Sequence, residues 1–340
     1  MSLRTPRSWY QRDRNRPAAT RWLTAPLSWT WTRVTARRIA RGASIRVGPP
    51  VICVGNLTLG GTGKTPVARE LARSLRASGI EVHVLMRGHA GRLRGPVRVR
   101  PGHHIAAEVG DEALMVAGEV PVWIARDRAR GAGAAAAAGA ELIVMDDGHQ
   151  NPTVAKDLSL VVVDGETREL EWPFGDGAVF PAGPMREPIP EGLARADAVV
   201  ILLPLDLPAP DPKLMELFTG TPTLIARLTP VGPPPRGPQF AFAGLGKPWK
   251  MERALRAAGC DLVDFAPLAD HQALGEPLLT RLAERAAKLG AGLITSEKDW
   301  VRLPPKWRER IVAWPVRARF EDEPALTTLL DPVLAQTRAG

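Results

Sequence analysis

The chain has 340 residues, 45% of them hydrophobic and 24% charged, which is long enough for two domains that each bury a core. Its two cysteines, Cys53 and Cys260, lie far apart without CxxC or histidine-rich spacing, which argues against a disulfide framework or a zinc site and indicates a reducing compartment. The net charge of +9 is concentrated near the start of the chain. Residues 1–48 hold eleven arginines and one acidic residue, giving +10, and the other 34 basic and 35 acidic residues give −1.

The basic arm, residues 1–48, is also rich in tryptophan. Four of the ten tryptophans in the chain lie in it: Trp9, Trp22, Trp29 and Trp31. Arginine beside tryptophan is typical of segments that bind nucleic acid through phosphates and base stacking. The same composition is typical of segments that lie at a bilayer interface. A basic tail that simply packs across the rest of the protein is a third interpretation.

Periodicity in the arm favours the bilayer. Five apolar side chains roughly follow one helical face: Trp22, Leu23, Leu27, Val34 and Ile39. Pro26 limits how early a continuous helix can start. Arg21 and Arg33 interrupt any apolar run of the roughly 18 residues that a membrane span needs. We therefore expect an amphipathic helix that lies on a membrane, and we expect anionic lipids as its partners.

Apolar runs alternate with helical patterns after the arm. The predicted elements up to residue 146 are strand 51–56, helix 66–79, strand 80–88, helix 112–119, strand 120–125, helix 127–140 and strand 141–146. Two more buried strands are predicted at 158–164 and 196–203. This alternation predicts an α/β fold whose doubly wound, mostly parallel sheet carries helices on both faces.

Two proline-rich stretches, 207–212 and 229–238, look like connections between domains. A second α/β unit is predicted behind them, with these strands and helices: strands 239–244, 260–266 and 291–296, and helices near 248–258 and 276–289. The expected domains are an arm over 1–48, a main α/β domain over 49–222 and a smaller α/β domain over 223–340 that closes a cleft.

Residues 58–65 read TLGGTGKT and nearly match the phosphate-binding pattern G-x-x-x-x-G-K-[ST], with Thr58 at the position of the first glycine. The loop follows a predicted buried strand and opens a helix, whose N-terminus favours anions. Lys64 can reach the β- and γ-phosphates, and the Thr65 hydroxyl can hold Mg²⁺. A purely structural glycine-rich turn is the alternative. The expected nucleotide-binding residues are Thr58, Gly60, Gly61, Thr62, Gly63, Lys64 and Thr65.

Asp146 and Asp147 end another predicted strand, at the sheet edge where the loop would lie. Nucleotide sites of this class take a further metal contact from such a carboxylate. Adjacent side chains on a strand point to opposite faces, so both can reach a metal only if the chain already turns at Gly148. We expect one metal ligand and one supporting or basic carboxylate; two solvated turn aspartates are the alternative.

Six segments stand together in the order VGNLTLGGTGKTP, GDEALM, MDDGHQ, PAGPMREP, ADHQ and TSEKD. Over residues 9 to 320 the chain thereby resembles the tetraacyldisaccharide 4'-kinase family. The resemblance implies a P-loop kinase fold with a second Rossmann-like domain and a membrane-associated N-terminal helix. It implies transfer of the ATP γ-phosphate, with Mg²⁺, to the 4'-hydroxyl of an acylated disaccharide 1-phosphate in lipid A biosynthesis. It places the protein at the cytoplasmic face of a bacterial inner membrane, and we expect a monomer.

The resemblance also assigns catalytic roles. It makes Asp111 the catalytic base and His271 its supporting histidine, with Lys64 stabilising charge. From the sequence alone Asp111 is a helix N-cap candidate, and a lone histidine such as His271 is more often structural. The pair would cross a domain cleft, so domain closure could assemble the site.

The same carry-over places Asp146 and Asp147 in the metal and water shell. Arg186 matches a family arginine near the site, and Arg128 is a weaker candidate for a substrate phosphate; an ordinary surface salt bridge is the alternative for both. The remaining TSEKD residues, Glu297, Lys298 and Asp299, are expected to be structural or to line the cleft.

Two departures from the family pattern remove no group assigned to chemistry. His149 stands where the family more often has phenylalanine, and Gln272 stands where a second histidine is common.

Two other functions fit parts of the sequence. A membrane-associated regulatory NTPase that used GTP would need an N/T-K-x-D motif, and the nearest segment, EKDW at 297–300, has Glu in place of Asn or Thr. A nucleic-acid-binding ATPase would need a basic channel, whereas the excess charge is confined to residues 1–48. We therefore expect no nucleic-acid partner.

Overall fold

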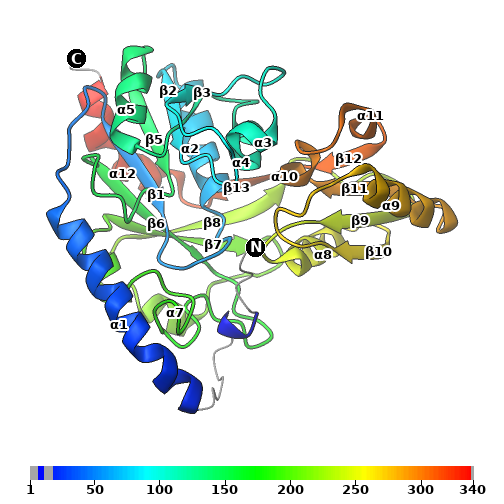
Figure 1. Cartoon of the computed structure of the whole chain (residues 1–340), viewed down its shortest axis with the longest axis horizontal. Coiled ribbons are helices and arrows are strands. Elements are labelled where there is room, and N and C mark those ends of the chain that lie inside the picture. Colours follow the sequence, from blue (N-terminus) through cyan, green and yellow to red (C-terminus); the bar gives the residue numbers. More distant parts are fainter. Residues whose placement is uncertain (1–6, 11–17, 338–340) are drawn as a thin grey trace.

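The computed structural model describes residues 7–10 and 18–337 of the chain. Figure 1 shows a larger unit built on one broad sheet and a smaller unit projecting from its side, with the long N-terminal helix along the opposite edge. Both units combine a sheet with packed helices, so the predicted α/β class is confirmed.

The larger sheet contains nine strands of the described chain, in the order β13-β8-β7-β6-β1-β5-β2-β4-β3. The strands from β8 to β4 pair in parallel, and β13 and β3 pair antiparallel at the two edges. Central strands such as β1 are buried throughout, as continuous apolar runs in parallel sheets are. The bounds are β1 Val51–Gly55, β2 Val82–Met86, β3 Val97–Arg98, β4 Val122–Ile124, β5 Leu142–Asp146, β6 Leu158–Asp164, β7 Ala198–Pro204, β8 Thr223–Pro230 and β13 Val316–Phe320.

Helices cover both faces of this sheet, as predicted. Buried side chains of α2, α4 and α12 share a cluster with one face, and those of α5, α6 and α7 pack on the other. The short α3 contributes Val109 to the first of these clusters, and a 3-10 helix, η1, lies near the start of the chain. The bounds are η1 Arg7–Tyr10, α2 Lys64–Ala77, α3 Ala106–Val109, α4 Asp111–Val116, α5 Arg128–Ala137, α6 Ile189–Leu193, α7 Pro212–Glu216 and α12 Glu323–Thr337.

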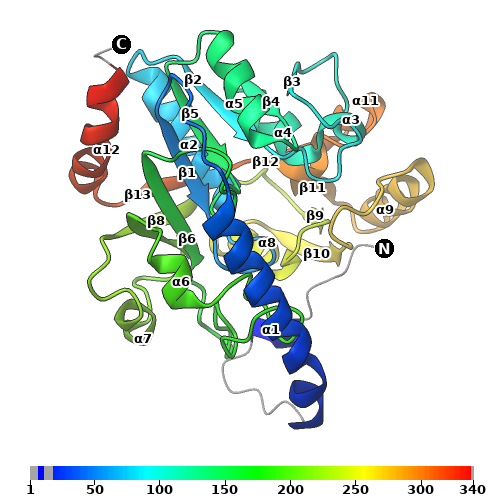
Figure 2. The ribbon, with the colours of Figure 1, turned by 60° about the vertical axis from the view of Figure 1, so that its left-hand side comes forward.

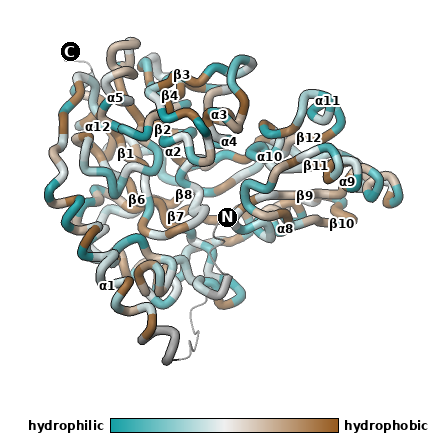
Figure 3. The backbone as a smooth tube through the Cα atoms, viewed as in Figure 1, coloured by the Kyte–Doolittle hydropathy of each residue, from teal (hydrophilic) through white to brown (hydrophobic). Residues whose placement is uncertain are grey.

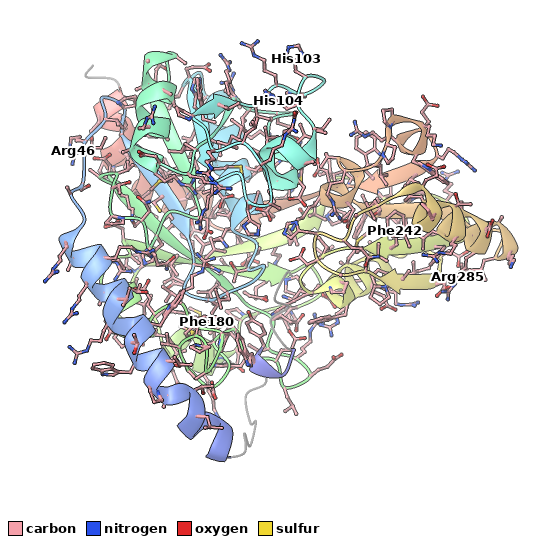
Figure 4. The ribbon with its side chains drawn as sticks, in the orientation of Figure 1. Arg46, His103, His104, Phe180, Phe242 and Arg285 are labelled. Atoms are coloured by element: carbon pink, nitrogen blue, oxygen red, sulfur yellow. The ribbon has the colours of Figure 1, made fainter. Side chains whose placement is uncertain are left out.

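The smaller unit has a parallel sheet of four described strands in the order β10-β9-β11-β12. Phe240 and Phe242 of β9 are buried in it against α9 and α11, and Figure 4 labels Phe242. The opposite face packs on α8. The bounds are β9 Gln239–Ala243, α8 Pro248–Ala257, β10 Leu262–Pro267, α9 Glu276–Lys288, β11 Gly292–Ser296, α10 Glu297–Trp300, α11 Pro305–Arg308 and β12 Ile311–Trp314.

Sheet membership differs from the division expected at residue 223. Both β8 and β13 belong to the larger sheet, where β8 pairs with β7 and β13 pairs with β8. The chain therefore enters the smaller unit after β8 and returns to the larger one through β13. Of the two proline-rich stretches, 229–238 does lead from one sheet to the other, whereas 207–212 leads from β7 into α7 of the larger unit.

The arm forms one long helix, α1, from Ala18 to Arg41, with Pro26 inside it rather than at its start. Figure 2 shows α1 crossing the face of the larger unit, and Figure 3 shows hydrophobic and hydrophilic stretches alternating along it. Its inner face is tied down where Ser28 Oγ donates to Val179 O (2.8 Å) and where Thr35 is buried. The side chain of Trp22, which was expected on the apolar face, lies outside the described residues.

Candidate active site

The phosphate loop joins β1 to α2, and its backbone explains the departure at Thr58. Thr58 forms an antiparallel β-bridge with Met185, an extended arrangement that does not need glycine. Left-handed backbone occurs instead at Gly60 (φ 95°) and Gly63 (φ 83°). The glycine-rich sequence would also allow left-handed backbone at Gly61, but Gly61 is not among the described residues with positive φ. Gly63 is further required because an added Cβ would lie 2.1 Å from Leu202 Cδ2.

Two buried side-chain contacts hold the loop in place. Asn56, at the end of the strand, donates from Nδ2 to Thr58 O (2.9 Å) and to Thr62 Oγ1 (3.0 Å). Lys64 and Thr65 then begin α2, as the phosphate-loop pattern predicts. The sequence therefore places the loop residues correctly at the N-terminus of a helix, where backbone N–H groups favour an anion.

Asp146 lies at the carboxyl end of β5, next to β1, and is buried with 3% of its surface exposed. Thr65 Oγ1 donates to Asp146 Oδ2 (2.8 Å), while Asp146 Oδ1 has no hydrogen-bond partner among the described residues. Burial, reinforced by the nearby charge of Glu112, raises the pKa of Asp146 to about 7. A buried carboxylate oxygen in this state is suited to a cation.

Asp147 has a different environment from its neighbour. Its backbone is left-handed (φ 56°), so the chain turns at Asp147 itself, one residue before the expected position. Arg186 Nη1 lies 2.8 Å and Lys64 Nζ lies 3.6 Å from Asp147 Oδ1. Burial alone would raise the pKa of Asp147, but these two cations outweigh it and hold the pKa well below its usual range.

Asp111 and His271, which are 160 residues apart in the chain, meet across the two units. His271 Nδ1 lies 2.9 Å from Asp111 Oδ2. Asp111 is the first residue of α4 and Gly110 is its N-cap, so Asp111 is not the cap residue that the sequence alone suggested. His271 lies in the loop after β10 of the smaller unit.

Charge explains the ionisation of this pair. Burial would raise the pKa of Asp111, but the hydrogen bond with His271 and the charges of Lys298 and Arg302 outweigh it, so the pKa is lowered. The same hydrogen bond raises the pKa of His271, against the effect of its own partial burial. The carboxylate and the imidazolium therefore stabilise each other.

Glu112 and Lys298 join the phosphate loop to the smaller unit. Thr65 Oγ1 lies 3.4 Å from Glu112 Oε2, and Lys298 Nζ lies 3.4 Å from Glu112 Oε1 and 3.3 Å from Asp270 Oδ1. These ion pairs agree with a structural role for Lys298, which was expected to be structural or to line the cleft. Sequence reasoning missed Glu112, although it stands beside Asp111 in the GDEALM segment, because its contact with Thr65 joins residues 47 apart in the chain.

Arg186 and Arg128 lie in different environments. Arg186 Nε donates to Thr58 O (2.9 Å), so its guanidinium lies beside the phosphate loop. Arg128, in contrast, is 3% exposed and donates to Ala125 O (2.5 Å), with Asp146 O at 3.5 Å. Burial lowers its pKa to about 10. The prediction that Arg128 contacts a substrate phosphate is therefore wrong, because its guanidinium is buried and contacts the backbone carbonyls of Ala125 and Asp146.

The His149 position is structural. Its Nε2 lies 2.9 Å from Gly192 O, and its ring is buried behind β1. The following residue, Gln150, donates to Asn56 O (2.8 Å) and to Glu187 Oε1 (2.9 Å), which ties the MDDGHQ segment to the start of the phosphate loop. The sequence predicted neither contact, since each joins segments that are distant in the chain.

Three features of the site occur together: a mostly parallel sheet, a glycine-rich loop that opens α2 beside β1, and a buried carboxylate at the end of the neighbouring β5. Together they define a P-loop kinase-like nucleotide-binding protein. A family model described as "Tetraacyldisaccharide-1-P 4'-kinase" matches residues 20–335. The chain belongs to the tetraacyldisaccharide 4'-kinase family.

Individual relatives support this placement over nearly the whole chain. A tetraacyldisaccharide 4'-kinase from Phenylobacterium zucineum (strain HLK1) is 65% identical over 97% of this chain and 99% of its own length. One from Caulobacter sp. (strain K31) is 61% identical over 98% and 99%. A crystal structure of LpxK from Aquifex aeolicus in complex with ATP matches with a TM-score of 0.70 and 25% identity, covering 92% of this chain and 99% of that one.

Proposed function

We propose that Asp111 accepts the proton of the acceptor's 4'-hydroxyl as the ATP γ-phosphate is transferred to that oxygen. The chain is a kinase that phosphorylates the 4'-position of a lipid A precursor with ATP, forming lipid IVA from a tetraacyldisaccharide 1-phosphate. The observation that carries the residue assignment is the contact of 2.9 Å between Asp111 and His271, made across the two units. No other carboxylate in the described site combines this partner with a position at the start of α4.

The reaction needs one proton transfer and one phosphoryl transfer. The hydroxyl O–H bond breaks toward Asp111, the oxygen bonds to the γ-phosphorus, and the bond from that phosphorus to ADP breaks. His271 orients the Asp111 carboxylate and stabilises its charge through their hydrogen bond. Lys64 and the N–H groups of the phosphate loop stabilise the developing negative charge on the phosphates.

Thr65 and Asp146 fit a magnesium ion. The Thr65 hydroxyl and the unpartnered Asp146 Oδ1 lie together at the end of β5, and oxygen ligands of this kind suit Mg²⁺. When bound, the ion would neutralise charge on the transferred phosphate. We assign Asp146 as the direct ligand, because Asp147 is occupied by Arg186 and Lys64.

Arg186 remains our candidate for contact with a substrate phosphate. Its guanidinium is partly exposed beside the phosphate loop, and it is held there by Asp147 and Thr58. Its backbone is also linked to the arm, because Trp31 Nε1 of α1 donates to Arg186 O (3.0 Å). The Trp31 ring packs edge-on against Phe180, which Figure 4 shows beside α1.

The outer face of α1 supports placement at a membrane. Leu23, Leu27 and Val34 form an apolar stripe that is 77%, 60% and 59% exposed. The exposed cations of the helix follow toward its C-terminal end: Arg33, Arg37, Arg38 and Arg41. Within the described residues, none of the helices is long and apolar enough to cross a membrane.

We infer that α1 lies on the cytoplasmic face of the inner membrane with its arginines on anionic lipid headgroups. This position brings soluble ATP and an acceptor anchored by acyl chains to one site. We further propose that the protein acts as a monomer and binds no nucleic acid, since the chain beyond residue 48 has a net charge of −1.

An acceptor-dependent transfer assay tests the proposal. Purified protein in detergent is incubated with ATP labelled at the γ-phosphate and with the disaccharide 1-phosphate, and the product is analysed for phosphate at the 4'-position. We expect Asp111→Ala to lower kcat by about 100-fold or more while ATP binding persists. Transfer by Asp111→Ala at the wild-type rate would show that the assigned base is wrong.

A further inference from the structure

We propose that Arg302 is a positioning residue for the Asp111–His271 pair, holding the turn that carries His271 and placing a fixed positive charge beside the Asp111 carboxylate. The inference rests on the proposed role of Asp111 as proton acceptor. Arg302 lies just after α10, three residues beyond Asp299 of the TSEKD segment. No motif of the sequence singled it out.

The guanidinium of Arg302 faces three different segments. Its Nη2 donates to Asp299 Oδ1, and its Nη1 donates to Gln272 O (3.0 Å). Its Nε lies 3.7 Å from Asp111 Oδ2 and has no hydrogen-bond partner within the described structure. Because the guanidinium is a planar fork with fixed donor directions, these contacts fix its orientation toward Asp111.

Asp299 anchors Arg302. Asp299 is fully buried, and its Oδ2 accepts hydrogen bonds from Gly244 N (2.9 Å) and Ser296 Oγ (2.6 Å). Gly244 leaves the necessary room, since an added Cβ there would lie 2.9 Å from Asp299 Oδ1 and 3.0 Å from Arg302 Nη2. Asp299, which accepts a hydrogen bond from Arg302, is therefore itself held rigidly in place.

The turn beneath His271 depends on the contact with Arg302. His271 has a left-handed backbone (φ 56°), which is unusual for a residue other than glycine. Gln272 N donates to Ala269 O (2.9 Å), and Ala269 N donates to Gln272 Oε1 (3.0 Å), which closes the turn. Arg302 donates to the backbone carbonyl of Gln272, so it fixes the position of the residue that follows His271.

Arg302 also differs electrostatically from the other cations near Asp111. A guanidinium does not lose its proton in proteins, whereas an imidazole can, so Arg302 and His271 place different kinds of positive charge beside Asp111. Lys298 makes ion pairs with both Glu112 and Asp270. The other charged and titratable groups around the pair are Lys298, Arg302, Glu112, Asp270 and His89, whose ring centroid lies 5.4 Å from that of His271.

The test compares Arg302→Gln and Arg302→Lys with the wild type in acceptor-dependent transfer as a function of pH. We expect Arg302→Gln to lower kcat about 10-fold to 100-fold with little change in either KM, because substrates still bind. We expect its acid limb to move up by about one pH unit, since an uncompensated carboxylate is harder to ionise. Arg302→Lys keeps the charge, so it should keep the wild-type acid limb and recover part of kcat.

Arg308→Gln is the matched control. Arg308 donates to Leu303 O (2.9 Å) and Val301 O (2.7 Å) in the same segment but does not face Asp111. We expect it to retain the wild-type kcat and acid limb. The inference would be overturned if Arg302→Gln kept the wild-type kcat and acid limb, or if Arg308→Gln lost as much kcat as Arg302→Gln. If Arg302→Gln does not fold, Arg302→Lys decides, and a shifted acid limb in that variant contradicts the proposal.

Asp111→Asn, measured in the same series, separates this inference from the proposed function. If Asp111→Asn transfers phosphate at the wild-type rate, the assigned base is wrong and the role of Arg302 falls with it. If Asp111→Asn loses transfer while Arg302→Gln does not, the assigned base stands and only the inference about Arg302 fails.

Discussion

Gly63 and Gly61 stand two residues apart in the phosphate loop but carry different constraints. An alanine at Gly63 would have to adopt φ 83° and would place its Cβ 2.1 Å from Leu202 Cδ2. An added Cβ at Gly61 would meet no described atom within 4 Å.

We predict that Gly63→Ala lowers the free energy of unfolding by about 1–2 kcal/mol or more, from the left-handed backbone alone. Gly61→Ala should change it by less than about 0.5 kcal/mol. Thermal unfolding without nucleotide checks both, and equal stability of the two variants would contradict the account of the loop.

The contact between His271 and Asp111 predicts a pH dependence of stability. The contact with Asp111 raises the folded-state pKa of His271 above its ordinary value of 6.5. The stabilisation from the imidazolium is therefore fully present below pH 6.5 and is lost as the pH rises through the raised pKa.

The wild type should therefore melt at a higher temperature than His271→Gln, and the difference should be largest below pH 6.5 and should shrink above pH 6.5. Melting curves of both proteins in matched buffers measure this difference. A gap that widens with rising pH would contradict the assigned ion pair.

At the scale of elements, α1 combines two faces with separate tasks. Its inner face contacts the larger unit through Ser28, Trp31 and Thr35, and its outer face exposes Leu27 and Val34. The third interpretation of the arm, a tail packed across the protein, thus describes the inner face. The prediction of a membrane-associated helix applies to the outer one.

Replacing Leu27 and Val34 with glutamate should weaken binding to anionic vesicles about 10-fold or more, because burying each such side chain contributes about 1.5–3 kcal/mol. Replacing Ala36 and Ala40 with glutamate adds the same charge to another exposed face of α1 and serves as the control. Vesicle co-sedimentation gives the partition coefficients. Equal binding by the Leu27/Val34 variant and the control would refute the membrane role of the stripe.

Contiguous elements could be predicted from the sequence, and contacts between distant ones could not. The phosphate loop was predicted because its strand, glycines and helix follow one another within residues 51–77. Neither β8 nor β13 was predicted as a strand, so both fell within the smaller domain expected over residues 223–340. Pro26 lies inside α1, although its missing N–H predicted a later start, since packing of the helix on the larger unit outweighs local preference.

The Asp111–His271 pair shows the same limit of sequence-based prediction. Asp111 and His271 are 160 residues apart, and only the resemblance to a family connected them before the structure did. Arg302 and the burial of Arg128 left no signal in the sequence, because each depends on how the two units and the strand ends pack.

At the scale of the whole molecule, Arg69 joins the two units. Arg69 of α2 is buried and makes paired contacts with Glu119 (2.8 Å) of the larger unit and with Glu297 (2.6 Å) of the smaller one. Arg73, one turn later on α2, makes an ion pair with Glu70 that is exposed on the arginine side.

Arg69→Met should lower the free energy of unfolding by about 3 kcal/mol, because it leaves the partly buried Glu297 without its cation and leaves Glu119 with Arg317 alone (3.0 Å). Arg73→Met should cost less than about 1 kcal/mol. Chemical denaturation of both variants measures the contrast, and similar values for the two would show that Arg69 does not link the units energetically.

We propose that Asp111 and His271 act as one unit in proton removal. A double-mutant cycle of Asp111→Asn and His271→Gln, measured as kcat for acceptor-dependent phosphate transfer, tests it directly. We predict that the double variant is no slower than Asp111→Asn alone, since His271 acts through the carboxylate. A loss in the double variant equal to the product of the two single losses would contradict the account.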